Sequence, residues 1–194
     1  MVATLGLRER KKLQAMRHIQ EVALDLFDRR GFEAVTIEEI AEAAQVSPSS
    51  IYRYFGTKEN VILWDEVDVR WFDAIENELA SRPPIDAMRQ ALAGAMADLL
   101  DRDEELSKRK TRYALGEPAL RPALLQLAED FTQQVTGAVA RASGRSPDDL
   151  EPRVIAAVMI AAMMAAARHW HDHDYRTQIR EDLEEALAVL ERGI

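Results

Sequence analysis

The sequence predicts an all-α protein of about nine helices, with a helix-turn-helix unit near its amino terminus. Apolar residues recur at spacings of three and four along nearly every segment, which is the period of an amphipathic helix. Capping and stop residues stand where these segments begin and end, and no alternating strand pattern competes with them. With 194 residues and no cysteine, the chain can build a sizeable core but offers no thiol chemistry, disulfide or thiolate-held metal.

Local signals place the helix boundaries. Thr36 and Glu39 have the spacing of a capping box, in which each residue bonds the other's backbone N–H. Ser47 and Pro48 suit the N-cap and the first position of a helix, and Gly56 suits its end. The expected helices are a first one that ends at Gly31, then 37–44, 48–55, a long linking helix over 57–79, and 85–101, 104–115, 119–142, 147–171 and 177–192.

Residues 36–55 have the plan of a helix-turn-helix, two short helices joined by the turn Gln45-Val46-Ser47. In the second helix Ile51 and Phe55 are four residues apart, so both can face a small core. The side chains that this leaves facing outward are Ser49, Tyr52 and Arg53. Because an α-helix fits the major groove of DNA, these three side chains can reach base edges there.

Further candidates for DNA contact flank this helix. Thr36, Ser50, Tyr54 and Lys58 stand at helix starts or ends, where hydroxyls, an ammonium and free N–H groups suit backbone phosphates. Arg10 and Lys11 belong to a basic cluster near the chain start. That cluster is either an arm that runs along the DNA or a solvated helix start.

These motifs resemble the TetR family of bacterial transcription regulators. The resemblance runs through residues 13–64 and rests on Ala23, Leu26-Phe27, Gly31-Phe32, Thr36-Ile37, Ile40-Ala41, Ala44, Val46-Ser47, Ile51 to Phe55 and Lys58-Glu59. It implies that the helix Pro48 to Phe55 enters the major groove, with base or sugar contacts from Pro48, Ser49 and Tyr52 and phosphate contacts from Thr36, Ser50, Tyr54 and Lys58. It also implies a dimer built through the last two helices and an effector pocket among the middle ones. Gln45 departs from the family, which commonly has Gly there, so the turn must hold a left-handed Gln or differ in geometry.

Charge divides the chain in two. Residues 1–60 hold nine basic and nine acidic side chains, whereas residues 61–194 hold sixteen and twenty-five and so carry the whole net charge of -9. We therefore expect two domains with different partners, a DNA-binding domain over 1–56 with its basic arm and an effector-binding and dimerisation domain over 57–194.

The middle helices carry large apolar residues that would line an effector cavity or, singly, serve as plain core. The candidates for the cavity are Trp71, Phe72, Met88, Met96, Tyr113, Phe131, Met159 and Met163. Such a lining favours a hydrophobic or amphipathic effector, an acyl or aromatic compound. The basic run Lys108 to Arg112 is either a binding site for a phosphate-bearing effector or the solvent-exposed face of its helix, which we favour.

The helix 147–171 is apolar nearly all round, so it must be covered on all sides. We expect a homodimer in which this helix and the last one form a two-fold four-helix interface; the alternative is an interior helix of a monomer. Its apolar run, Val154 to Ala167, has fourteen residues where a bilayer span needs roughly 20, so no membrane association is expected. Charges begin at Arg8, which does not suit an export signal, and we expect a cytoplasmic location.

The sequence thus predicts a transcription regulator, a ligand-released repressor that binds a near-palindromic operator. The competing classes are a small enzyme and a helical module that binds only protein. No phosphate-binding Gly loop, nucleophile elbow, zinc-protease signature or dinucleotide fingerprint is present, so we expect neither catalysis nor a cofactor. His169 and His173 could share one helix face, but we favour a structural role over a metal site for them.

Overall fold

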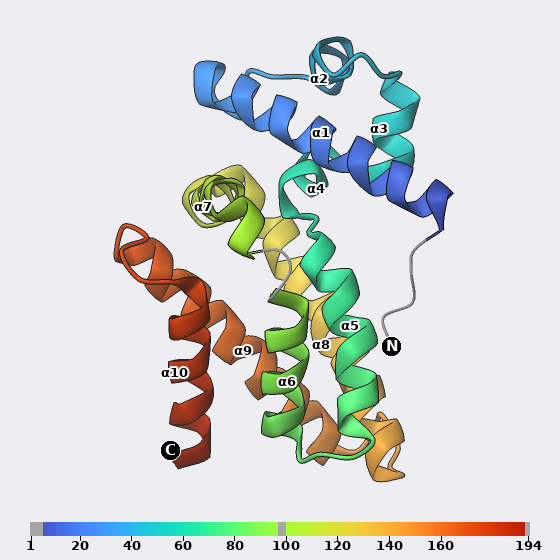
Figure 1. Ribbon diagram of the computed structural model, residues 1–194, viewed down its shortest axis with the longest axis vertical. Coiled ribbons are helices and arrows are strands. Elements are labelled where there is room, and N and C mark those ends of the chain that lie inside the picture. The colour runs from blue at the N-terminus through green and yellow to red at the C-terminus, as the bar shows by residue number, and fades with distance from the viewer. Residues whose placement is uncertain (1–5, 97–99, 193–194) are drawn as a thin grey trace.

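The computed structural model is an elongated stack of helices. It describes residues 6–96 and 100–192, and the side chains of all of these except 66–70, 73, 92, 94–96 and 100–103. Figure 1 shows α1–α3 at one end of the molecule and the bundle of α5, α6, α8, α9 and α10 at the other, with α4 and α7 between them. We call α1–α4 the amino-terminal unit, and α5, α6 and α8–α10 the carboxy-terminal bundle.

The described residues form ten α-helices and one 3₁₀ turn, close to the predicted nine helices. The α-helices are α1 Leu7–Arg30, α2 Ile37–Ala43, α3 Pro48–Phe55, α4 Lys58–Leu63, α5 Glu66–Leu79, α6 Pro84–Met96, α7 Leu100–Gly116, α8 Arg121–Ser143, α9 Leu150–Asp172 and α10 Ile179–Arg192, and the 3₁₀ turn η1 is Pro118–Leu120.

The local signals in the amino-terminal unit act as expected. The Thr36 side chain accepts from the Glu39 backbone N–H, and the Glu39 carboxylate accepts from the Thr36 N–H at 2.9 Å, which completes the capping box. Ser47 caps α3 with Pro48 in its first turn, and Gly56 ends α3 at φ 78°. Gln45 takes φ 56°, so the turn holds a left-handed Gln in the place where a glycine costs least.

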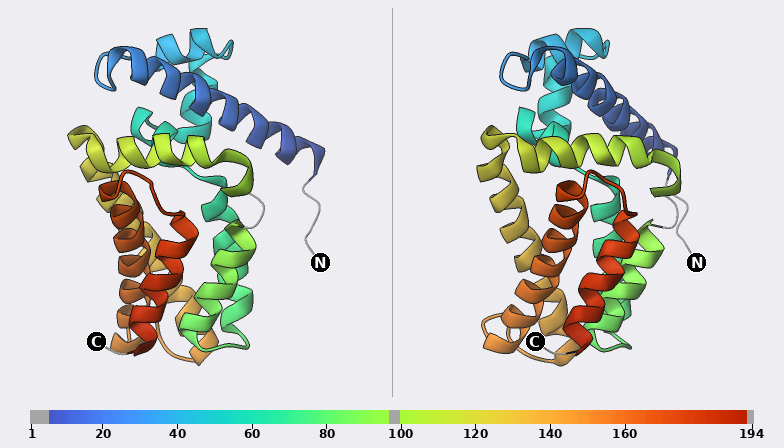
Figure 2. Two further views of the ribbon diagram at one scale, coloured as in Figure 1. Left: turned by 60° about the vertical axis from the view of Figure 1, so that its left-hand side comes forward. Right: turned by 90° about the vertical axis from the view of Figure 1, so that its left-hand side faces the viewer.

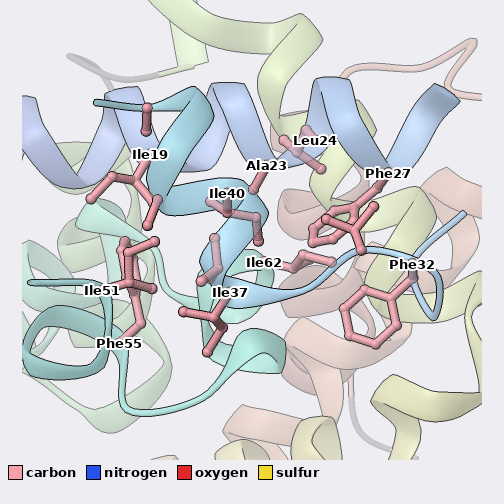
Figure 3. Close-up of a cluster of buried hydrophobic side chains, with 14 of the residues drawn as sticks. Ile19, Ala23, Leu24, Phe27, Phe32, Ile37, Ile40, Ile51, Phe55 and Ile62 are labelled. Atoms are coloured by element: carbon pink, nitrogen blue, oxygen red, sulfur yellow. The ribbon is translucent and has the colours of Figure 1, made fainter. Parts of the chain in front are cut away.

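A hydrophobic cluster joins the helices of the amino-terminal unit (Figure 3). Ile51 and Phe55 enter this cluster from α3, and Ile19 and Ile40 enter it from α1 and α2. Leu120 of η1 is part of the same cluster with no exposed surface, although it lies far along the chain. The amino-terminal core is therefore completed by residues from the second half of the protein.

The prediction of one continuous linking helix over 57–79 is wrong, because the structure has two helices there. α4 ends at Leu63, Trp64 is extended at ψ 134°, and α5 begins at Glu66. The backbone carbonyls of Val61 and Trp64 accept hydrogen bonds from side chains of other helices, in place of the N–H groups that a continuous helix would supply.

The second hydrophobic cluster fills the carboxy-terminal bundle. Trp71 and Ile75 of α5, Met88 of α6, Val139 of α8 and Met159 of α9 are among its buried members. Figure 2 shows α7 crossing between this bundle and the amino-terminal unit.

α9 is mostly apolar but is only partly covered within one chain. By length and composition it could cross a bilayer, as many core helices of soluble proteins could, with a mean hydropathy of 1.7 over its most apolar window. Only 33% of that window is buried, so a single chain does not cover this helix on all sides.

Candidate DNA interface and the contacts that hold it

α3 presents two different faces. Ile51 and Phe55 are 0% and 5% exposed, whereas Tyr52, which directly follows Ile51 in the same helix, is 50% exposed. Pro48, Ser49 and Arg53 are also exposed. The buried pair fixes the rotation of α3, and this rotation leaves a row of polar and planar side chains in solvent.

The hydroxyls at the start of α3 hydrogen-bond to one another. The Ser47 Oγ lies 2.8 Å from the Ser49 Oγ and 2.9 Å from the Ser50 Oγ. Arg53 donates to the Ser50 Oγ at 3.3 Å, and its guanidinium lies 4.9 Å from the centre of the Tyr54 ring. These contacts hold the outward side chains of α3 in defined positions before any ligand arrives.

Two of the predicted phosphate-binding residues, Thr36 and Lys58, also form hydrogen bonds that stabilise the fold. The Thr36 hydroxyl belongs to the α2 cap, and its partner Glu39 has a pKa below the usual value because of the hydrogen bond from the Thr36 N–H and then the bond from Arg30. The Lys58 ammonium donates to the carbonyls of Phe32 and Val35, each at 2.9 Å, so it ties α4 to the loop between α1 and α2.

Arg10 and Lys11 lie on the first turns of α1, which already begins at Leu7. Both side chains are exposed. The basic segment is thus part of a helix over the described residues.

The structure brings together most of the predicted effector-lining residues, but not all. Trp71, Met88 and Met159 are buried in the bundle cluster, and Phe131 and Met163 pack against it. Phe72, also a predicted lining residue, links this set, since its ring centre is 4.8 Å from those of both Trp71 and Phe131. The side chain of Met96 lies outside the described residues.

Tyr113 lies apart from that set. It packs against the amino-terminal cluster, and its hydroxyl donates to Asp28 Oδ1 at 2.8 Å. Burial and then this bond to a carboxylate raise the pKa of Tyr113 to about 12.

A groove of about 540 Å³ runs between the amino-terminal unit and α8. Tyr54, Phe55 and Trp64 border it on one side, and Leu127 and Asp130 on the other. None of the predicted effector-lining residues whose side chains the structure describes borders this groove.

The basic run on α7 is paired within the chain. Arg109 donates to Asp25 and to Asp28, each at 2.7 Å, and Arg112 donates to Asp28 at the same distance. Burial of Asp28 opposes its ionisation, but the bonds from Tyr113 and Arg109 outweigh it and lower the pKa of Asp28. The prediction that this run lies on the solvent-exposed face of its helix is confirmed for Arg112. It is wrong for Lys110, which is only 9% exposed.

The histidines near the end of α9 have structural partners. The rings of His169 and His173 are stacked with centres 3.9 Å apart, and His169 Nδ1 lies 3.1 Å from a carboxylate oxygen of Asp182. Within residues 6–96 and 100–192, no group of three or more His, Asp or Glu side chains could hold a metal ion.

Sequence reasoning missed Gln20 and treated Lys110 only as part of the basic run, although both bind the chain at the break between α4 and α5. Gln20 is 2% exposed and donates to the carbonyls of Val61 and Trp64, at 2.8 and 2.7 Å. Lys110 donates to the same Trp64 carbonyl at 2.7 Å and to Asp65. The available signal was a polar residue on the apolar face of each helix, since Gln20 is four residues from both Met16 and Leu24.

An exposed, pre-shaped helix on a capped helix-turn-helix, carried by an all-helical bundle, defines a DNA-binding transcription regulator. Comparison with known proteins identifies the family. The model described as "Bacterial regulatory proteins, tetR family" matches residues 19–63, and the "MftR C-terminal domain" model matches residues 82–194. The chain belongs to the TetR family.

Individual relatives agree with this assignment. The HTH-type transcriptional regulator TcmR of Streptomyces glaucescens is 31% identical over 95% of this chain and 82% of its own length. MftR of Mycobacterium tuberculosis, named for the regulation of mycofactocin biosynthesis, is 28% identical over 95% of this chain and 93% of its own. The fold also matches that of Thermus thermophilus FadR, a repressor solved with lauroyl-CoA, at a TM-score of 0.56 and 24% identity over 92% of this chain and 94% of FadR. The relatives are regulators and not enzymes, as the sequence predicted.

Proposed function

We propose that the protein is a repressor that binds a near-palindromic operator as a homodimer and is released by a small hydrophobic or amphipathic molecule. Residues 1–56 would read the DNA, and residues 57–194 would bind the effector and form the dimer. The observation that carries this proposal is the rotation of α3, with Ile51 and Phe55 buried and Tyr52 exposed. Base contacts would come from Pro48, Ser49, Tyr52 and Arg53.

Phosphate contacts would come from a second set of residues around α3. They are Thr36, Ser50, Tyr54 and Lys58, joined by Arg10 and Lys11 of α1. Thr36 and Lys58 already hold the unit together, so a phosphate would bind to groups whose positions are fixed. We propose that the protein acts in the cytoplasm, where its operator lies.

The uncovered side of α9 supports the dimer. Leu150, Val154 and Val158 are 76%, 49% and 37% exposed and follow one another at four-residue spacing. Ala157, Ala161 and Ala165 are exposed on the same helix, and such small residues let two helices approach closely. A second copy of the chain would bury this stripe and form the four-helix interface.

The buried aromatic and methionine set of the carboxy-terminal bundle supports an apolar effector. Trp71, Phe131 and Met159 would contact it, and Met88 and Met163 can adapt in shape. FadR, a protein of the same fold, was solved with lauroyl-CoA, and we propose an acyl or aromatic compound here as well.

The proposal is tested by gel retardation with DNA from upstream of the protein's own gene. We expect a retarded complex that contains two chains. Lauroyl-CoA or an aromatic metabolite should dissociate this complex. Absence of any sequence-preferring complex would favour the protein-interaction module. Val154→Glu should convert the dimer to a monomer in analytical ultracentrifugation, while Gln134→Glu, at an exposed polar position of α8, should leave it a dimer.

A further inference from the structure

At the break between α4 and α5, side chains of two other helices, α1 and α7, bind the same backbone atom. The Trp64 carbonyl accepts from Gln20 Nε2 of α1 and from Lys110 Nζ of α7, both at 2.7 Å. Gln20 belongs to the amino-terminal unit, whereas Lys110 comes from the helix that crosses between the two parts (Figure 2). One donor from α1 and one from α7 therefore fix the chain where it changes direction.

Lys110 is the stronger of the two links. Its ammonium also donates to Asp65 Oδ2 at 2.5 Å, and its side chain is 11% exposed. Charge-assisted bonds are stronger than neutral ones, and low exposure protects this one from screening by salt. A cation at the carboxy-terminal end of α4 also complements the dipole of that helix.

Three further side chains of α7 bind α1. Arg109, Arg112 and Tyr113 all donate to Asp28, and Arg109 also donates to Asp25. On its other side α7 packs against α9 of the carboxy-terminal bundle. A shift of α7 would thus pull at α1 and at the α4–α5 break together, and α3 would move with them because it packs on α4.

We propose that Lys110 is the positioning residue that sets the orientation of the amino-terminal unit on the carboxy-terminal bundle. We call its bonds to the Trp64 carbonyl and to Asp65 the grip, and we propose that an effector in the bundle acts on DNA binding through it. The proposal deepens the proposed function and rests on it only for the effector step. The grip itself is a property of the free protein, so it is measurable without operator or effector.

The test measures the distance between the two parts directly. The chain contains no cysteine, so spin labels attach only at introduced sites. Glu42→Cys on α2 and Gln134→Cys on α8 are both at exposed positions. The labelled protein is mixed with a large excess of unlabelled chain, and pulsed dipolar spectroscopy then reports the distance distribution within one protomer.

Lys110→Met removes the charge and the donors but keeps a long apolar side chain in the buried position. We expect it to broaden the distance distribution relative to the parent. Lys108→Met is the matched control, because Lys108 has the same chemistry on the same helix but pairs with Glu104 of α7 itself. We expect this control to leave the distribution unchanged.

An unchanged distribution in Lys110→Met would overturn the proposal. If that variant does not fold, Asp65→Asn decides, because it weakens the grip at a partly exposed residue while the Trp64 carbonyl keeps its bond from Lys110. A distribution identical to the parent's would then refute the grip. A loss of thermal stability without broadening would likewise reduce Lys110 to a structural role.

Operator binding provides the second readout. If only about one tenth of Lys110→Met molecules hold the competent orientation, operator affinity falls about tenfold, while Lys108→Met binds as the parent does. A broadened distribution together with no sequence-preferring binding by the parent would refute the proposed function and leave the grip intact. Parental operator affinity in Lys110→Met would refute its link to DNA binding.

Discussion

Ile51→Ala and Tyr52→Ala form a pair of adjacent substitutions that test the rotation of α3. Ile51 has no exposed surface, and truncation to Ala removes three buried carbons at about 0.8 kcal/mol each. The cavity left behind adds to this, so we expect Ile51→Ala to lower the free energy of unfolding by about 2–5 kcal/mol. Tyr52 is 50% exposed, and its truncation should change stability by no more than about 0.5 kcal/mol.

Tyr52→Ala, which should hardly change stability, should have a clear effect on DNA binding. Tyr52→Ala should weaken specific binding by about 1–3 kcal/mol, roughly a 5- to 150-fold rise in Kd, and leave non-specific binding nearly unchanged. Urea unfolding followed by tryptophan fluorescence measures the first effect, because Trp64 lies in edge contact with Phe55 of α3 at 6.1 Å. Fluorescence anisotropy with operator and with scrambled DNA measures the second. Equal stability losses in the two variants, or equal losses on both DNAs in Tyr52→Ala, would refute the assigned rotation of α3.

Three further predictions follow from the structure. Gln45→Gly should raise the free energy of unfolding by up to about 1 kcal/mol in urea titrations, since it relieves the left-handed backbone at φ 56°; a loss of stability would show that the turn is not strained. Absorbance titration of the phenols should show one group with a pKa of about 12 that is missing in Tyr113→Phe, and stability that this group supplies should be complete below about pH 10 and lost as the pH rises toward 12. If Arg10, Lys11 and Lys58 of each protomer all bind phosphates, operator affinity should fall with salt at a logarithmic slope of about -5, and a flat response would exclude those ionic contacts.

The helix-turn-helix was predictable because its signals are local. The Thr36 and Glu39 pair and the Ser47-Pro48 start each act within four residues, and the structure has both caps. Gln45 shows the same locality, since the turn keeps its left-handed geometry even with a residue that disfavours it.

The break at Trp64 was not predictable because its causes are distant in sequence. Gln20 lies 44 residues before the carbonyl that it binds, and Lys110 lies 46 residues after it. The stripe of apolar residues on either side is compatible with a continuous helix, and only the folded arrangement supplies the donors that replace the helical N–H groups.

Tyr113 illustrates the same limit for the effector site. The apolar period places Tyr113 on the inner face of α7, but it does not say which core that face meets. The structure puts the ring against Phe27 of α1, at a centre distance of 5.9 Å, instead of inside the bundle.

The burial of Leu120 in the amino-terminal cluster has a consequence for synthesis. As the chain leaves the ribosome, α1–α4 emerge first, yet their core lacks Leu120, and the flanking Leu106 and Tyr113, until a further stretch of translation is complete. A nascent or truncated chain that ends before residue 106 would expose the apolar side of α1 and so become a target for chaperones and proteases. The cell would therefore obtain a completely packed amino-terminal unit only from chains that extend through α7 and η1.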